Sequence, residues 1–298
     1  MTHLLGAKKD KPDPRDYRYG RVLAPVPVPP IVDHEPEMTP VRDQGQRSAC
    51  VGFASCAVKE YADRRRLTKP VTDFDLSEEF VYEQVRGPGG GAYPRDAFKL
   101  MAKAGVCRES LLPYRTDITD ATEPTWNPVK NRRALGNALN YKAQGYARIT
   151  TLDELQQSLA TNGPCMIGVT WLNGWFAPKE KIDGYPVLRP KQGTVAGGHA
   201  LCVVGYDTAR RFLKIKNSWG TSWGKSGYCL MSFDALGQTL QDAWALFDLT
   251  SPLVNAAGIK QAKLNRRSAG RARGRSRGIA VTSRPSVDPA KSRAGCPW

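Results

Sequence analysis

The sequence contains little histidine and no closely spaced cysteine pair. Only three of its 298 residues are histidine, and its seven cysteines form no C-x-x-C motif. A zinc site needs several Cys or His ligands at short spacings, so the sequence argues against a structural metal. An odd number of cysteines likewise argues against a framework of disulfides. We therefore expect buried, reduced thiols and no metal or cofactor.

Long apolar runs are also missing. The N-terminus, MTHLLGAKKDKPDPRDYRYG, has only two leucines ahead of charged residues and prolines, so it lacks the apolar centre of a signal peptide. No stretch of about 18 apolar residues is available for a transmembrane helix. Hydrophobic residues make up 41% of the chain and charged residues 24%, as in ordinary globular proteins. We expect a monomer that is cytoplasmic, or exported without a cleavable signal peptide.

Composition divides the chain into three regions. Residues 1–37 are rich in proline and charge, which favours an extended arm over the surface. Residues 38–255 contain the periodic apolar segments of a folded domain. Residues 256–298 contain eleven Lys or Arg and one Asp, a net +10 of the chain's +16, and we expect this tail to be disordered. It offers at most a weak accessory contact with nucleic acid or an acidic partner, because no aromatic residues lie between its arginines.

Helical periodicity comes first along the chain, and strand patterns come later. Helices are predicted over 49–66, 76–86, 95–105 and 151–161. Their expected N-caps include Ser48, Ser77 and either Thr151 or Asp153. Short β-branched or aromatic runs predict strands over 165–171, 199–207, 212–219 and 227–234. Helices followed by strands indicate an α+β fold with two segregated lobes.

One cysteine and one histidine are suited to nucleophilic catalysis. A reactive thiol needs a lowered pKa, which a helix N-terminus and a neighbouring imidazolium both favour. Cys50 is predicted to begin a helix. His3 lies in the terminus and His34 in the proline-rich arm, whereas His199 opens the apolar strand HALCVVGYD, which can hold an imidazole rigidly. We assign Cys50 as nucleophile and His199 as its base and acid.

Three further side chains can support this pair. Asn217 ends the next predicted strand, where it can orient the ring of His199. Trp219 can shield that contact from water. Gln44, six residues before Cys50, can present its side-chain amide to a developing oxyanion beside the backbone N–H of the nucleophile.

Several segments resemble the papain family of cysteine peptidases, in the family's order, across residues 38–250. DQGQRSACVGFA is similar to its glutamine-to-cysteine loop, and LSEEFVYEQ and GGGAYPRDAFKLMAKAGVCRESLLPY resemble its helices and glycine-rich strand. GGHALCVVGYD resembles its histidine strand, and KNSWGTSWGKSGY its asparagine segment. The resemblance implies a helical N-terminal lobe, an antiparallel β-barrel-like C-terminal lobe and an active-site cleft between them. It also implies a cysteine endopeptidase that hydrolyses proteins or peptides through a Cys50 thioester.

The same resemblance implies which residues bind substrate. A glycine-rich strand would bind the substrate main chain, and three glycines would leave a roomy, uncharged pocket for the second residue before the scissile bond. Such a pocket favours bulky apolar side chains unless Trp171, Trp175 or Phe176 fill it. The implied residues are Gly91 and Ala92 in the strand, Gly168, Gly197 and Gly198 in the pocket, and Trp219 beside the histidine.

The chain departs from the family pattern around the nucleophile. Arg47 stands where the family usually has a cysteine, three residues before the nucleophile, and the partner cysteine near Gly89 is also absent. The loss of both halves of a disulfide fits a reducing compartment. Val51 replaces the aromatic residue that commonly follows the nucleophile, which alters packing beneath the helix start.

Two alternatives to peptide hydrolysis stay open from the sequence. A thioester can be discharged to an amine or to water, so the same site could serve a deamidase, transpeptidase or isopeptidase. The fold could also be a non-catalytic scaffold whose basic tail binds nucleic acid. A further hypothesis concerns regulation: residues 12–35 could cross the cleft as a short built-in blocker, because the long inhibitory pro-region of many secreted relatives is absent.

Overall fold

The computed structural model describes residues 3–24, 26–65, 74–121 and 126–248. The chain separates into two compact units, Met1–Asn255 and Ala256–Trp298. The second unit contains the predicted basic tail and lies outside the described residues. Within the part that the structure describes, no helix has the length and apolar character needed to span a membrane.

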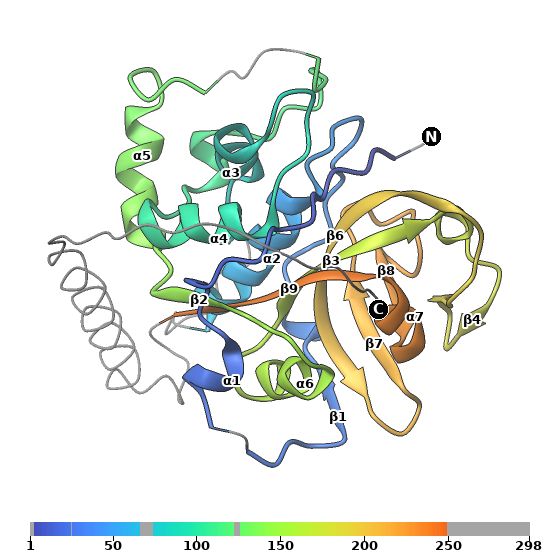
Figure 1. Ribbon diagram of the computed structural model, residues 1–298. Helices are drawn as coiled ribbons and strands as arrows, with labels where there is room; N and C mark the ends of the chain where they lie inside the picture. Colours follow the sequence, from blue (N-terminus) through green and yellow to red (C-terminus); the bar gives the residue numbers. More distant parts are fainter. Residues whose placement is uncertain (1–2, 25, 66–73, 122–125, 249–298) are drawn as a thin grey trace, which may run out of the picture. The chain divides into compact units, whose positions relative to one another are not determined.

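Helices dominate the first half of the first unit (Figure 1). The central helix α2 is buried along nearly its whole length and packs against α3, α4 and the sheet. The helices are α1 (Tyr19–Val22), α2 (Cys50–Arg64), α3 (Glu78–Val85), α4 (Pro94–Lys103), α5 (Arg132–Ala138), α6 (Leu152–Thr161) and α7 (Phe233–Thr239), with short 3-10 turns at Glu35–Glu37, Glu109–Leu111, Leu139–Tyr141 and Asn173–Phe176.

Strands form one large sheet in the order β2-β9-β3-β6-β7-β8-β5-β4, with β1 paired to β6. All neighbours are antiparallel except β5 and β8. The strands are β1 (Ile31–Asp33), β2 (Gly145–Arg148), β3 (Cys165–Leu172), β4 (Lys181–Ile182), β5 (Tyr185–Leu188), β6 (Val195–Asp207), β7 (Phe212–Lys216), β8 (Tyr228–Ser232) and β9 (Leu240–Phe247). The predicted α+β class is confirmed. The expected barrel-like closure is not found, because the described strands β2 and β4 end the sheet without pairing to each other.

Two of the predicted helix caps are present and one is not. Ser77 accepts a hydrogen bond from the N–H of Phe80, and Thr151 accepts one from the N–H of Glu154. The predicted cap Ser48 is wrong, because the residue that precedes α2 is Ala49, which makes no side-chain cap. The N-terminus of α2 therefore has no side-chain oxygen from its own cap position competing for its free N–H groups.

The proline-rich arm contributes to the fold instead of lying only on its surface. Tyr19 in α1 is fully buried, and β1 pairs with β6 next to the sheet's central strands. The first residues of the arm run to the point where α2 meets β6, which is where the candidate site lies.

Candidate active site

The start of α2 and the middle of β6 bring the predicted nucleophile and base together. Cys50 is the first residue of α2, and the N–H of Ala200 in β6 points at its Sγ with an N···S distance of 3.4 Å. His199 directly precedes Ala200 on the same strand. Both Cys50 and His199 are fully buried. Antiparallel pairing of β6 with β3 and β7 holds this part of the strand in register.

The imidazole of His199 is fixed by one hydrogen bond and two indole rings. Its Nε2 lies 2.8 Å from Oδ1 of Asn217, so Nε2 carries the proton and donates. Its Nδ1 has no hydrogen-bond partner among the described residues. The rings of Trp219 and Trp171 lie 4.8 Å and 4.9 Å from the imidazole, centroid to centroid. The ring therefore keeps one orientation and leaves Nδ1 free.

Gln44 is buried beside this group and is oriented by a serine that the sequence did not single out. Ser218 Oγ donates to Gln44 Oε1 at 2.7 Å, which forces the amide nitrogen to the opposite side. Nε2 of Gln44 then donates to the carbonyls of Arg47, at 2.7 Å, and Leu4, at 2.9 Å. In the sequence, the position of Ser218 directly after Asn217 was the feature that could have identified it as part of the site.

The N-terminal strap, residues 3–10, fills the cleft between the two lobes. The N–H of Ala7 donates to the carbonyl of Gly198 at 2.9 Å. The N–H of Lys8 donates to the carbonyl of Ala92 at 2.9 Å, and the N–H of Ala92 donates to Gly6 at 2.8 Å. The strap runs parallel to the chain at Ala92. A segment does cross the cleft, but it is residues 3–10 and not the 12–35 expected from the sequence.

Close backbone approach and a buried carboxylate hold the strap. A Cβ atom on Gly198 would lie 2.0 Å from the Ala7 oxygen, so only glycine allows this contact. At the far end of the strap, the N–H of Asp10 donates to Asp242 Oδ2 at 2.7 Å. Oδ2 of Asp10 accepts from the N–H of Arg95 at 3.0 Å and from Trp244 Nε1 at 3.1 Å.

His3 also contacts the site, although the sequence offered no signal for this. Its ring stacks on Trp219 with a centroid distance of 4.6 Å and an angle of 5°. Burial lowers the pKa of His3. The histidine dismissed as terminal is therefore part of the cover over the indole beside His199.

Burial beneath the strap keeps the cysteine and the histidine neutral. Desolvation raises the pKa of the Cys50 thiol to about 11, although nearby main-chain N–H groups, including those of Ala200 and the strap, oppose the rise. Desolvation also lowers the pKa of His199 to about 4, with the Asn217 hydrogen bond acting in the opposite direction. Each shift disfavours a charged form, so burial under the strap favours the neutral thiol and the neutral imidazole over the thiolate–imidazolium pair.

The predicted substrate-binding residues lie in different places around the cleft. Gly91 and Gly198 line an open groove of about 740 Å³, together with the strap and Phe176, and Ala92 bonds the strap main chain. Gly168 lies deeper: a Cβ there would be 3.6 Å from Pro94 Cγ and 3.8 Å from Asp242 Cβ. Trp219 is fully buried. Trp171 and Trp175 are also fully buried and pack edge to face.

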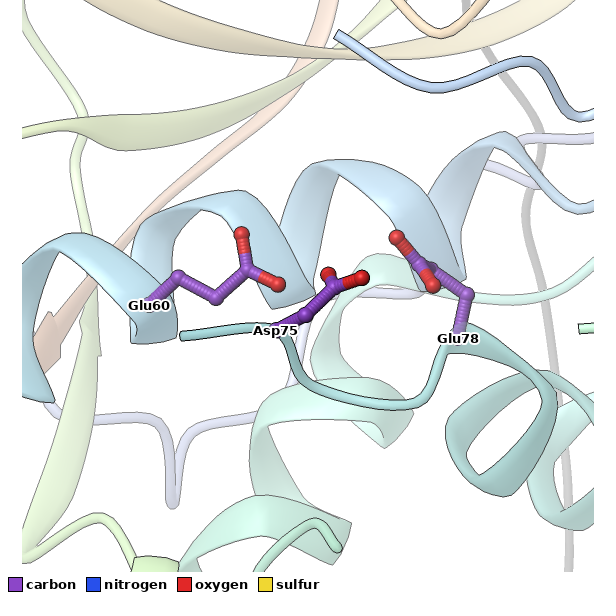
Figure 2. A group of neighbouring side chains, drawn as sticks. All are labelled: Glu60, Asp75 and Glu78. Atoms are coloured by element: carbon purple, nitrogen blue, oxygen red, sulfur yellow. The ribbon is translucent and has the colours of Figure 1, made fainter. Parts of the chain in front are cut away.

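A cluster of three carboxylates, Glu60, Asp75 and Glu78, lies behind the site (Figure 2). Their oxygens point toward one another (Figure 2), and cations lie beside them. Arg42 pairs with Asp75 at 2.6 Å and with Glu78. Burial raises the pKa of Glu60 to about 7, and Lys216, which precedes Asn217, opposes the rise. We interpret the cluster as an ion network that joins α2, α3 and β7 and not as a metal centre.

Comparisons with known protein families give a match over most of the chain. The model of the papain family cysteine proteases matches residues 28–240. An uncharacterized peptidase C1-like protein of Acanthamoeba polyphaga mimivirus is 25% identical over 86% of this chain and 90% of its own length. Cysteine proteinase 3 of Entamoeba histolytica is 29% identical over 70% of this chain and 64% of its own.

Solved structures give the same picture of the fold. Xylellain, a cysteine protease from Xylella fastidiosa, is 28% identical, with a TM-score of 0.68, and the match covers 82% of this chain and 96% of xylellain. A Carica candamarcensis cysteine protease in complex with E-64 is 25% identical, with a TM-score of 0.59 over 74% of this chain and 99% of its own.

Proposed function

Because the chain belongs to the papain family of cysteine proteases, we propose that Cys50 and His199 are the reacting pair of a cysteine endopeptidase. Asn217 orients the base, and Gln44 donates to the oxyanion. The observation that carries this assignment is the His199 Nε2 to Asn217 Oδ1 hydrogen bond of 2.8 Å on a strand whose next N–H, that of Ala200, lies 3.4 Å from Cys50 Sγ.

The reaction follows from this arrangement once the thiol proton has moved to His199. The sulfur of Cys50 attacks the peptide carbonyl carbon, and the carbonyl electrons pass to oxygen. His199 then gives its proton to the leaving amine as the C–N bond breaks, and a thioester forms. Water attacks the thioester carbonyl while His199 takes its proton. The C–S bond then breaks, the carboxyl product leaves, and His199 returns the proton to the sulfur of Cys50.

The oxyanion position is supported by the contacts of Gln44. Its Nε2 lies 2.9 Å from the main-chain oxygen of Leu4. The carbonyl of Leu4 therefore occupies the place where a substrate carbonyl would accept a hydrogen bond from this amide. The backbone N–H of Cys50, at the helix start, is the second donor. Two donors fixed before reaction stabilise the charge that develops on oxygen in the transition state.

The substrate is an extended polypeptide, because the cleft binds main chain. Gly198 and Ala92 make backbone hydrogen bonds to the strap, and these bonds do not depend on side-chain identity. An extended substrate would use the same carbonyl and N–H groups after the strap has left. Gly197 and Gly198 beside the groove leave room for a bulky apolar side chain.

The test is covalent labelling by E-64, read by intact mass, together with turnover of a fluorogenic peptide library. Wild type, Cys50→Ala, His199→Ala and the control Cys56→Ala, a buried cysteine of the same helix, would be compared. We expect one label and peptide cleavage in wild type and Cys56→Ala only. Cleavage that survives in Cys50→Ala would overturn the assignment. Label without hydrolysis, with products joined to an added amine, would favour acyl transfer to amines instead.

A further inference from the structure

Arg47 carries a buried charge three residues before the nucleophile, and the reaction above does not use it. Its guanidinium nitrogens lie 2.5 Å from Glu79 Oε2 and 2.6 Å from Glu83 Oε1. The side chain of Arg47 is fully buried, and the two glutamates of α3 are at most 2% exposed. Arg86, whose side chain is 2% exposed, also pairs with Glu83 at 3.0 Å. Removal of Arg47 would therefore leave Glu79 as the carboxylate without its arginine, an unpaired charge away from water.

Two tyrosine rings enclose the same guanidinium. Cζ of Arg47 lies 5.1 Å from the ring centroid of Tyr82 and 5.0 Å from that of Tyr114. Its remaining polar contact includes the carbonyl of Arg115 at 3.1 Å. A planar guanidinium can stack between rings and also form two separate ion pairs, whereas a lysine ammonium cannot reproduce this geometry.

The hydroxyls of these tyrosines form hydrogen bonds with residues of the proposed active site and with Asp120. Tyr114 Oη donates to the main-chain oxygen of Gln44 at 2.8 Å. Tyr82 Oη donates to Asp120 Oδ1 at 2.8 Å and accepts from the N–H of Gly91, which lines the groove, at 3.0 Å. The rings that hold Arg47 are therefore bonded both to the oxyanion glutamine and to the substrate-binding strand.

The backbone at Arg47 makes two further connections. Its carbonyl accepts from Gln44 Nε2 at 2.7 Å. The next residue, Ser48, donates its N–H to Asp120 Oδ2 at 2.7 Å, and Asp120 is the same carboxylate that Tyr82 holds. The turn before Cys50 and the side-chain amide of Gln44 are thus held by one connected set of contacts around Arg47.

We propose that Arg47 is a positioning residue that fixes the amide of Gln44 relative to Cys50. It acts through buried ion pairs and stacked rings, at the position where the family usually has one half of a disulfide. The inference rests on the proposed function, since Gln44 matters only if an oxyanion forms. A support of this kind contains no sulfur and is therefore insensitive to reducing agents.

The expected effect is on the acylation transition state. A displacement of about 1 Å in a group that contacts the reacting atoms can reduce the rate by about 100-fold, and oxyanion donors act mainly in the transition state. Loss of Arg47 should therefore lower kcat by about 10- to 100-fold with a smaller change in KM. Alkylation of Cys50 by iodoacetamide forms no oxyanion, so its rate should stay close to that of wild type.

The experiment compares full-length wild type with Arg47→Lys, Arg47→Met and the double variant Arg47→Met/Glu79→Leu, which keeps Glu83 as the partner of Arg86. For each, kcat and KM on a fluorogenic peptide, the iodoacetamide rate and urea unfolding are measured. Replacing both Arg47 and Glu79 by apolar side chains is expected to restore folding stability but not kcat. Arg47→Lys, which keeps the charge without the planar fork, should be intermediate in kcat.

The double variant keeps the proposal falsifiable if Arg47→Met does not fold. Wild-type kcat in a stable double variant would overturn the positioning role, as would equal losses of kcat and alkylation rate in Arg47→Met. Failure of the proposed function gives a different result, because wild type itself would then hydrolyse no peptide.

Discussion

The main-chain oxygen of Leu4 accepts a hydrogen bond of 2.9 Å from Nε2 of Gln44. The strap therefore places its own carbonyl where the proposed oxyanion donor points. The strap groups that face Cys50 Sγ are the N–H groups of Gly6 and Ala7, which are not electrophiles. The strap thus occupies the proposed oxyanion position with the carbonyl of Leu4 and covers Cys50 with main-chain N–H groups, so we expect substrate binding to require that the strap move.

The first prediction concerns displacement of the strap by Gly6→Ala. A Cβ on Gly6 would lie 2.0 Å from the main-chain oxygen of Ser48, so the variant cannot keep the strap in place. We expect kcat/KM to rise by about tenfold or more, because the fraction of molecules with an open cleft limits apparent affinity. Initial rates on a fluorogenic peptide measure the change.

The matched control is Gly237→Ala, since a Cβ at Gly237 meets nothing within 4 Å. It should leave kcat/KM unchanged. Deletion of residues 1–10 should reproduce the Gly6→Ala increase. An unchanged or lower kcat/KM in both strap variants, with wild-type unfolding curves, would show that the strap does not restrict access.

The second prediction concerns the pH dependence of thiol reactivity. Burial raises the pKa of Cys50 to about 11 and lowers that of His199 to about 4, and both shifts depend on exclusion of water. Displacing the strap hydrates both groups, so the thiolate should form at lower pH. The midpoint of iodoacetamide alkylation against pH should fall in Gly6→Ala relative to wild type.

Intact mass spectrometry follows this alkylation, and Cys50→Ala supplies the background from the other cysteines. The two pKa shifts also predict how strap binding depends on pH. The strap should bind less tightly as the pH falls from the ordinary pKa of histidine, 6.5, toward about 4, and as the pH rises from the ordinary pKa of cysteine, 9.0, toward about 11. Coincident alkylation midpoints in wild type and Gly6→Ala would contradict the explanation by burial.

The third prediction concerns Asn217→Ala. The variant removes the acceptor for His199 Nε2, and one lost hydrogen bond of about 1.4 kcal/mol corresponds to about a tenfold lower kcat/KM. Steady-state kinetics test this, with Asn140→Ala, at an exposed position, as the control. If both variants retain wild-type kinetics, Asn217 does not orient the base.

The fourth prediction concerns the ion network behind the site. Arg42→Met removes the cation beside Glu78, which is 5% exposed, and Asp75, which is 38% exposed. Because the arginine and Asp75 are partly exposed to water, the free energy of unfolding should fall by about 1–3 kcal/mol at neutral pH. Arg189→Met is the matched control, because its pair with Glu180 is about 40% exposed on each side (39% and 41%) and should cost less than about 1 kcal/mol.

Acid should reduce the effect of Arg42→Met. Burial raises the pKa of Glu109, and Arg42, which pairs with it at 3.3 Å, opposes the rise. Without the arginine the pKa of Glu109 should rise further, so the variant regains stability as the pH falls and this carboxylate is protonated. Urea unfolding at several pH values measures this. A pH-independent difference between the variant and wild type would indicate lost packing instead of uncompensated charge.

The sequence by itself determines the local elements that carry the chemistry. The periodicity after Ala49 predicts a helix that begins at the cysteine, and α2 begins at Cys50. The apolar run around His199 predicts a strand, which is β6. These features depend on side-chain patterns that repeat over a few residues, so they can be read from neighbouring residues alone.

Only the tertiary structure decided how the site is covered and supported. The strap binds through main-chain N–H and carbonyl groups of residues distant in the chain, such as Gly198. Every residue type except proline carries both groups, so no side-chain pattern marks them. The cluster around Arg47 needs α3 and two tyrosines at one point in space. The sheet stays open because of long-range strand pairing, which a strand's own sequence does not specify.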